Sequence, residues 1–139
     1  MAQLIQINYQ DKRPIYEQVT DKIRRLIVTG VLPPEEKIPS VRSLAIDLSI
    51  NPNTIQKAYQ ELERLGFVYT VKGRGNFVSP REQWAEGVSE ELLGRFRSCV
   101  RELSAVGMKT DEIVGIVREE TDHTAKETTD SKGEKGKKP

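Results

Sequence analysis

Four polar side chains share one face of a helix that the sequence predicts after Asn51. They are Asn53, Gln56, Lys57 and Gln60. Because they lie three, four and seven positions apart, they are neighbours on the helix surface. The amide of an Asn or Gln can pair with the adenine edge in the major groove of DNA, and a lysine can reach a guanine or a phosphate. An ordinary solvent-exposed polar face would show the same pattern. The elements on either side of the helix must therefore decide between a DNA-binding face and an ordinary surface.

The start of this helix also suits a phosphate group. The side chains of Asn51, Asn53 and Thr54 can bond phosphate oxygens, and the N-terminus of a helix favours an anion. Ordinary helix caps are the alternative interpretation of these residues. The order of the surrounding helices and strands favours the interpretation that these residues contact DNA.

Two further segments with cationic side chains lie before and after this helix. Ser40 and Arg42 begin the preceding helix, where the helix dipole slightly disfavours a cation. A phosphate or base contact explains Arg42 better, with a surface ion pair as the alternative.

Lys72, Gly73 and Arg74 form the tip of a predicted hairpin. A cation there can enter the minor groove, and glycine lets the backbone approach the duplex; an ordinary charged hairpin is the alternative.

The elements that position these residues follow a recognisable order. Helices are predicted to begin at Pro14, Ser40 and Asn51, since proline suits a first helical position while Ser and Asn suit an N-cap. Apolar residues recur along each helix at helical spacing. Two strands, Phe67–Val71 and Asn76–Val78, follow as a hairpin. Three helices and a hairpin, with a short link between the second and third helices, predict a winged helix-turn-helix.

Beyond Pro80 the sequence predicts two amphipathic helices. Ser89 can cap the first, Gly107 can stop it, and the second begins near Thr110. Two helices of this size cannot form a core alone, so their apolar faces need the first domain, another chain, or both. The residues that we predict for dimerisation are Leu92, Phe96, Val100 and Leu103.

The predicted fold class is mainly α with a small β-hairpin, a winged helix-turn-helix followed by a short helical dimerisation domain. The predicted parts are a DNA-binding domain over residues 1–80, a two-helix dimerisation domain over residues 81–121 and a disordered tail over residues 122–139. Residues 1–80 carry 11 Lys and Arg against 8 Asp and Glu, whereas residues 81–120 carry 6 against 9. A basic first part joined to an acidic second part fits a nucleic-acid module with an appendage.

Several classes of protein are excluded by what the chain lacks. Its 139 residues include one cysteine, Cys99, and one histidine, His123. No paired carboxylates, nucleophile with a base, or cluster of metal ligands can be nominated, so we predict no enzyme, no cofactor and no metal site. No apolar run approaches a membrane span, and the first residues lack the features of a secretion signal. We therefore expect a cytoplasmic protein without a membrane partner.

Ordered motifs over roughly residues 10–80 resemble the GntR family of bacterial regulators, and the short C-terminal part points to its YtrA subfamily. The motifs are Pro14–Gln18, Ile38–Arg42, Asn51–Thr54, Ala58–Glu63, Gly66-Phe67 and Gly73–Gly75. The resemblance implies a winged-helix repressor that dimerises through its C-terminal helices. It also implies an inverted-repeat operator, often near ABC transporter genes in the regulator's own operon.

The resemblance carries over DNA contacts to matching positions only. These are Arg42, Asn51, Asn53, Thr54, Gln56 and Lys72-Gly73. Many family members have arginines where this chain has Pro52 and Gln56, so arginine contacts to guanine cannot be made from those two positions. The operator preferences of other members therefore do not transfer.

Two functions remain open on the sequence. The first is a dimeric repressor that binds double-stranded DNA at an inverted-repeat operator. The second is a winged-helix module that binds protein and no operator. The sequence leaves room for a small-molecule effector at the dimer interface and does not identify one.

Overall fold

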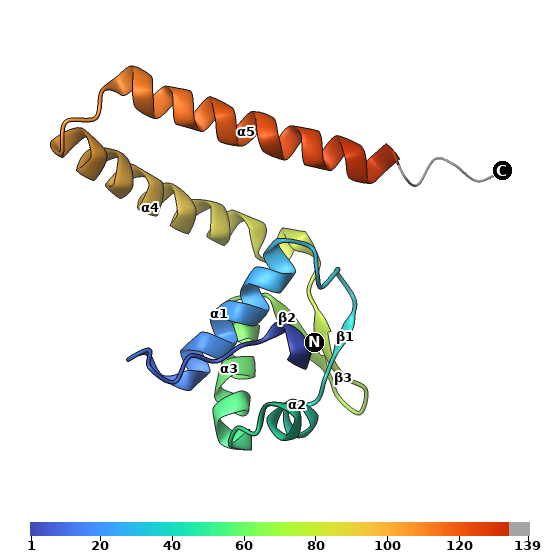
Figure 1. Ribbon diagram of the computed structural model, residues 1–139. Coiled ribbons are helices and arrows are strands. Elements are labelled where there is room, and N and C mark those ends of the chain that lie inside the picture. The colour runs from blue at the N-terminus through green and yellow to red at the C-terminus, as the bar shows by residue number, and fades with distance from the viewer. Residues whose placement is uncertain (134–139) are drawn as a thin grey trace. The chain divides into compact units, whose positions relative to one another are not determined.

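The computed structural model describes the backbone of residues 1–133 and the side chains of residues 1–126. The chain forms two compact units, Met1–Ser89 and the residues from Glu90 onward, which we call unit 1 and unit 2. The helices are α1 (Ile15–Val28), α2 (Val41–Leu48), α3 (Pro52–Arg64), α4 (Ala85–Ala105) and α5 (Thr110–Gly133), the strands are β1 (Lys37–Ile38), β2 (Val68–Val71) and β3 (Gly75–Val78), and two 3-10 helices span Ala2–Leu4 and Arg81–Gln83 (Figure 1).

The predicted helix starts are confirmed. Pro14 is the N-cap of α1. The Ser40 hydroxyl accepts a bond from the backbone N–H of Ser43 at 3.1 Å, and the Asn51 side chain accepts one from the N–H of Asn53 at 2.9 Å. These bonds satisfy N–H groups that a helix start leaves without intrahelical partners. Short polar caps therefore fix where α2 and α3 begin, and with them the helix-turn-helix.

Gly66 directly follows α3 and its C-cap residue Leu65. Its φ is +85°, and a Cβ there would lie 2.8 Å from the carbonyl oxygen of Gln83. Both the left-handed backbone and the close approach require a glycine. The chain turns here from α3 into β2, so this residue sets the direction of the hairpin relative to the helix.

The hairpin belongs to a three-stranded antiparallel sheet in the order β1-β3-β2. β2 and β3 pair with Val68 opposite Val78 and Val71 opposite Gly75. β1 adds two residues to the outer edge of β3, with Lys37 opposite Phe77. The sequence did not predict β1, because a two-residue strand is too short to show alternation.

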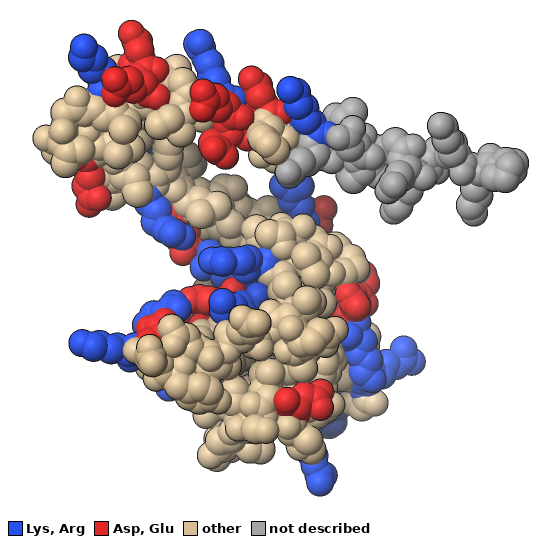
Figure 2. Space-filling view, viewed as in Figure 1, with Lys and Arg blue, Asp and Glu red and all other residues tan. Residues whose placement is uncertain are grey.

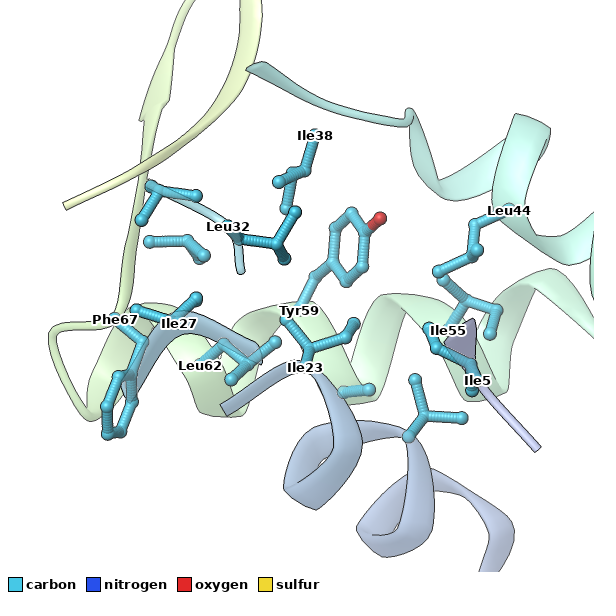
Figure 3. Packing of buried hydrophobic residues seen from close by; sticks show 14 of the residues in the cluster. Ile5, Ile23, Ile27, Leu32, Ile38, Leu44, Ile55, Tyr59, Leu62 and Phe67 are labelled. Atoms are coloured by element: carbon cyan, nitrogen blue, oxygen red, sulfur yellow. The ribbon is translucent and has the colours of Figure 1, made fainter. Parts of the chain in front are cut away.

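The core of unit 1 is built chiefly from α1, α2, α3 and the sheet. α1 packs chiefly on α3, and α2 also packs on α3. The largest fully buried side chains are Val19, Ile23, Ile38, Leu44, Ile55, Leu62 and Val78 (Figure 3). Burial of apolar surface on this scale is the main stabilising contribution to such a fold. The core therefore holds α3 in place while its opposite face stays exposed.

Unit 1 extends beyond the predicted boundary at residue 80. α4 begins at Ala85 rather than at Ser89. Trp84 and Val88 are buried in the core of unit 1, and the Trp84 ring stacks on Phe67 with 5.6 Å between ring centroids. Pro80, on which we based the predicted boundary, interrupts the backbone pattern, whereas the packing of unit 1 continues to Val88.

Unit 2 contains both predicted helices, and Gly107 lies between them with a φ of +98°. α5 continues to Gly133, although a disordered tail was predicted from residue 122. No Gly or Pro interrupts residues 116–132, so no residue in this stretch breaks the helical backbone. The Thr121 hydroxyl also donates to the carbonyl of Val117 at 2.8 Å. The rest of the predicted tail, residues 134–139, lies outside the described residues.

None of the described helices has the combination of length and apolarity that crossing a membrane requires. Among the described residues, no group of three or more His, Cys, Asp and Glu is placed to hold a metal ion.

Candidate nucleic-acid interface

One face of α3 is exposed, and it is the face that the sequence predicted. The side chains of Ile55, Ala58, Tyr59 and Leu62 are buried against the core. Asn53, Gln56, Lys57 and Gln60 are exposed on the other side, and Thr54 is half-buried. The short amides at the start of α3 are thus free to meet a ligand edge, which is the geometry that major-groove recognition needs.

Lys57 differs from its neighbours on that face. Its ammonium lies 4.0 Å from the centroid of the Tyr16 ring, at the start of α1. A cation over an aromatic face at an exposed site contributes about 0.5–1 kcal/mol. Lys57 is therefore held at the α1 edge of the face, whereas Asn53 and Gln56 have no such tether.

A hydrogen bond fixes the start of α2 relative to α3. The hydroxyl of Tyr59 donates to the carbonyl of Pro39 at 2.7 Å, directly before the N-cap Ser40. Burial raises the pKa of Tyr59, so the phenol remains protonated and keeps donating. Sequence reasoning placed Tyr59 in the apolar stripe and missed this bond. The signal was available, because a buried tyrosine hydroxyl usually finds a partner.

Arg42 lies in the first turn of α2 and is exposed. It forms no ion pair with any residue that the structure describes. The Ser40 hydroxyl accepts a backbone bond and still has its own proton to donate. Arg42 and Ser40 thus both present polar groups at the start of α2.

The predicted wing is a tight turn with exposed cations. Gly73 has a φ of +79° and Gly75 a φ of +124°, and the N–H of Arg74 donates to the carbonyl of Val71 at 2.9 Å. Lys72, Gly73 and Arg74 are all exposed. Within residues 1–126, neither Lys72 nor Arg74 forms an ion pair. The turn therefore presents two cations and a bare backbone at its tip.

A groove of about 330 Å³ runs along the wing and reaches the start of α2. Its lining includes Lys37, Ser40, Lys72, Arg74 and Asn76. Figure 2 shows Lys and Arg side chains gathered over β1 and the β2–β3 hairpin. Sequence reasoning brought Ser40 and the wing into one site and missed Lys37, because nothing in the sequence pairs residue 37 with the hairpin.

The predicted dimerisation residues lie in unit 2 on an apolar surface. Leu92 is 47% exposed and Phe96 is 49% exposed, while Val100 and Leu103 are half-buried. Phe96 and Val100 also line a groove of about 400 Å³ between α4 and α5, together with Ile113. No described side chain from residue 89 to residue 126 is buried.

A helix-turn-helix with an exposed amide face on its second helix and a cationic wing defines a winged-helix DNA-binding protein. The family model of bacterial regulatory proteins, gntR family, matches residues 15–78. The chain belongs to the GntR family and is a transcription regulator.

Two bacterial relatives support this membership along most of the chain. The chain is 33% identical over 118 residues to the HTH-type transcriptional repressor YtrA of Bacillus subtilis, covering 84% of this chain and 91% of the relative. It is 36% identical over 107 residues to the uncharacterized HTH-type transcriptional regulator YhcF of Bacillus subtilis, covering 76% and 88%. The predicted resemblance to the GntR family is confirmed, and so is the prediction of a regulator rather than an enzyme.

The fold is shared with a solved structure. A GntR family transcriptional regulator from Listeria monocytogenes is 33% identical, with a TM-score of 0.68 over 80% of this chain and 98% of that one. The predicted fold class, mainly helical with a winged helix-turn-helix and a helical C-terminal part, is confirmed.

Proposed function

We propose that this regulator is a dimeric repressor that binds an inverted-repeat operator in double-stranded DNA. The observation that carries the proposal is the division of roles between the units. Unit 1 presents an exposed amide face, Arg42 and a cationic wing around one rigid core, whereas the described part of unit 2 buries no side chain after Val88. The first unit is suited to DNA, and the second needs a partner.

In the proposed complex α3 enters the major groove. Asn53 and Gln56 pair with adenine edges, because each amide can donate and accept toward the same base. Asn51, Thr54 and Ser40 bond backbone phosphates near the starts of α3 and α2, and Lys57 can leave the Tyr16 ring for a phosphate at the edge of the groove. Arg42 supplies a phosphate or base contact.

The wing contacts the neighbouring minor groove. Lys72 and Arg74 are long cations on a narrow turn, and a narrow minor groove concentrates negative potential that attracts such side chains. Gly73 has no side chain to hold the backbone away from the duplex. Major-groove pairing thus supplies sequence selection, while the wing adds affinity and sensitivity to groove width.

A second copy of the chain covers the apolar surface of unit 2. Leu92, Phe96, Val100 and Leu103 supply an apolar surface continuous with the α4–α5 groove. An exposed apolar surface of this kind marks an interaction site in a soluble protein. Dimers with two-fold symmetry place two recognition helices about one DNA turn apart, which explains an inverted repeat.

Repression follows from occlusion, because a dimer on a promoter excludes polymerase from the same DNA. On the resemblance alone, we extend the proposal to the regulator's own operon with ABC transporter genes. A small-molecule effector would act through the dimer interface. The groove between α4 and α5 is a candidate binding site for it. The site of action would be the cytoplasm, where bacterial DNA lies.

Selection of binding sites from random double-stranded DNA, followed by mobility shift with competitor DNA, tests the proposal. We expect two inverted half-sites with adenines under α3. A single asymmetric site would contradict the dimeric mechanism. A complete lack of sequence-selective binding would instead favour a winged-helix module that binds protein.

A further inference from the structure

A lysine outside the predicted interface lies across the base of the wing. Lys37 of β1 is opposite Phe77 in the sheet, so Lys37, Phe77 and Gly75 share one face of the sheet, opposite the face that carries buried Ile38. The Lys37 side chain extends diagonally over Gly75, toward the wing tip. Its Cε lies 2.9 Å, and its ammonium nitrogen 3.7 Å, from the position that a Cβ on Gly75 would take.

The absence of a side chain at Gly75 is what allows this path. A Cβ at that position would meet the end of the Lys37 alkyl chain, and the φ of +124° is a conformation that other residues rarely adopt. The glycine thus shapes the turn and also leaves a track for the lysine. As a result a third cation is brought from a separate strand to the wing.

The three cations line the same groove. Lys37, Lys72 and Arg74 all contribute to the groove of about 330 Å³ beside the wing. None of them forms an ion pair within residues 1–126. No Asp or Glu is among the described residues that line this groove. Cations that share a groove repel one another, and an anion bound there would relieve that repulsion.

We propose that Lys37, laid across Gly75 toward the wing tip, binds a backbone phosphodiester of duplex DNA in the groove that it shares with Lys72 and Arg74. The inference rests on the proposed function, because it requires that unit 1 binds DNA. A lysine ammonium is a compact charge suited to a phosphate. Such a contact adds affinity and carries no sequence information of its own.

The test compares full-length variants on two duplexes of about 30 base pairs, long enough for two half-sites about one helical turn apart. One duplex has a mixed sequence and the other is the selected operator. Lys37→Gln removes the charge, and Lys37→Met removes it while keeping an alkyl chain over Gly75. Arg81→Gln is the matched control, since Arg81 is exposed and follows β3 at the end away from the wing tip. The fluorescence of Trp84, the chain's only tryptophan, monitors folding of unit 1.

We expect both Lys37 variants to bind either duplex up to about fivefold more weakly, the range of an exposed ion pair. The slope of log K against log salt should become shallower by about 0.9, the contribution of one phosphate. Lys37→Arg should retain most of the wild-type slope, and the unfolding transition of Trp84 should not move.

Three results would overturn the inference. If wild type binds with a steep salt dependence and both Lys37 variants keep its slope, the phosphate contact is absent while the proposed function stands. If Lys37→Met matches wild type and only Lys37→Gln is weakened, or if Arg81→Gln loses as much slope as the Lys37 variants, no local phosphate contact exists. If wild type itself shows no salt-dependent DNA binding, the proposed function fails together with this inference.

Discussion

The two units of this regulator bury their apolar residues in opposite ways. In unit 1, Val19, Ile23, Leu44, Ile55 and Leu62 are fully buried by residues of the same unit. In unit 2, every described side chain from residue 90 to residue 126 is at least partly exposed, Phe96 included. The difference teaches that unit 1 has its own core, while the two helices of unit 2 leave apolar side chains exposed, which is why we propose that a second chain covers them.

The largest effect should come from the core of unit 1. Ile23→Ala removes a fully buried side chain between α1 and α3 and should destabilise unit 1 by about 2–5 kcal/mol. The matched change Leu92→Ala, on the exposed face of α4, should change the stability of unit 1 by less than about 0.5 kcal/mol. Urea unfolding followed by Trp84 fluorescence measures both. Equal losses would break the contrast between the units.

A smaller effect is expected from a charge on the apolar surface of unit 2. Phe96→Asp should weaken dimerisation by about 2 kcal/mol or more, which is about thirtyfold in Kd, because it puts a carboxylate into a buried interface. Val31→Asp is the control, since Val31 is an exposed apolar residue of unit 1. Sedimentation across a range of protein concentrations checks the change. A Phe96→Asp protein with the wild-type dimer constant would place the interface elsewhere.

Loss of a single cation from unit 1 should have a still smaller effect. Arg42→Ala and Lys72→Ala should each weaken DNA binding by about 1 kcal/mol and reduce the salt slope by about 0.9. Arg81→Ala serves as the control. Titrations on operator DNA at several salt concentrations make the measurement. Wild-type affinity in both variants would remove Arg42 and the wing from the interface.

An effect of similar size is expected from the bond between α3 and the start of α2. Tyr59→Phe removes the bond to the Pro39 carbonyl and should cost about 1 kcal/mol at neutral pH. Burial raises the pKa of Tyr59, so above pH about 10 the unfolded chain loses the proton first and the folded state loses relative stability.

The pH dependence separates this bond from general packing. Stability from the protonated phenol is fully present below pH about 10 and declines as the pH rises above it. Tyr59→Phe should therefore show a shallower alkaline decline than wild type when unfolding is followed from pH 7 upward. Parallel declines would show that Tyr59 does not titrate as the structure indicates.

Local chemistry made most of unit 1 predictable from the sequence. Ser40 and Asn51 cap their helices through bonds to residues two or three positions away, so their roles are encoded within a single turn. Gly66 and Gly73 adopt positive φ after α3 and in the hairpin turn, two places where glycine is the residue that the backbone favours. The exposed face of α3 followed from the helical spacing of its buried residues.

Features that depend on distant contacts were not predictable. β1 exists because Lys37 and Ile38 pair with β3, and the path of Lys37 across Gly75 joins segments far apart in the chain. The extent of unit 1 depends on the packing of Trp84 against Phe67. α5 continues to Gly133, beyond the apolar pattern on which we based the tail prediction, because no Gly or Pro interrupts its backbone over residues 116–132.

The central claim, that unit 1 recognises DNA and unit 2 pairs two chains on it, is tested most directly by comparing a complete operator with a single half-site. Wild type should bind the selected inverted repeat far more tightly than one half-site at the same salt, since two linked recognition helices act together. Phe96→Asp should bind both DNAs with similar, weak affinity. The account is contradicted if Phe96→Asp keeps the wild-type preference for the complete operator, or if wild type shows no such preference.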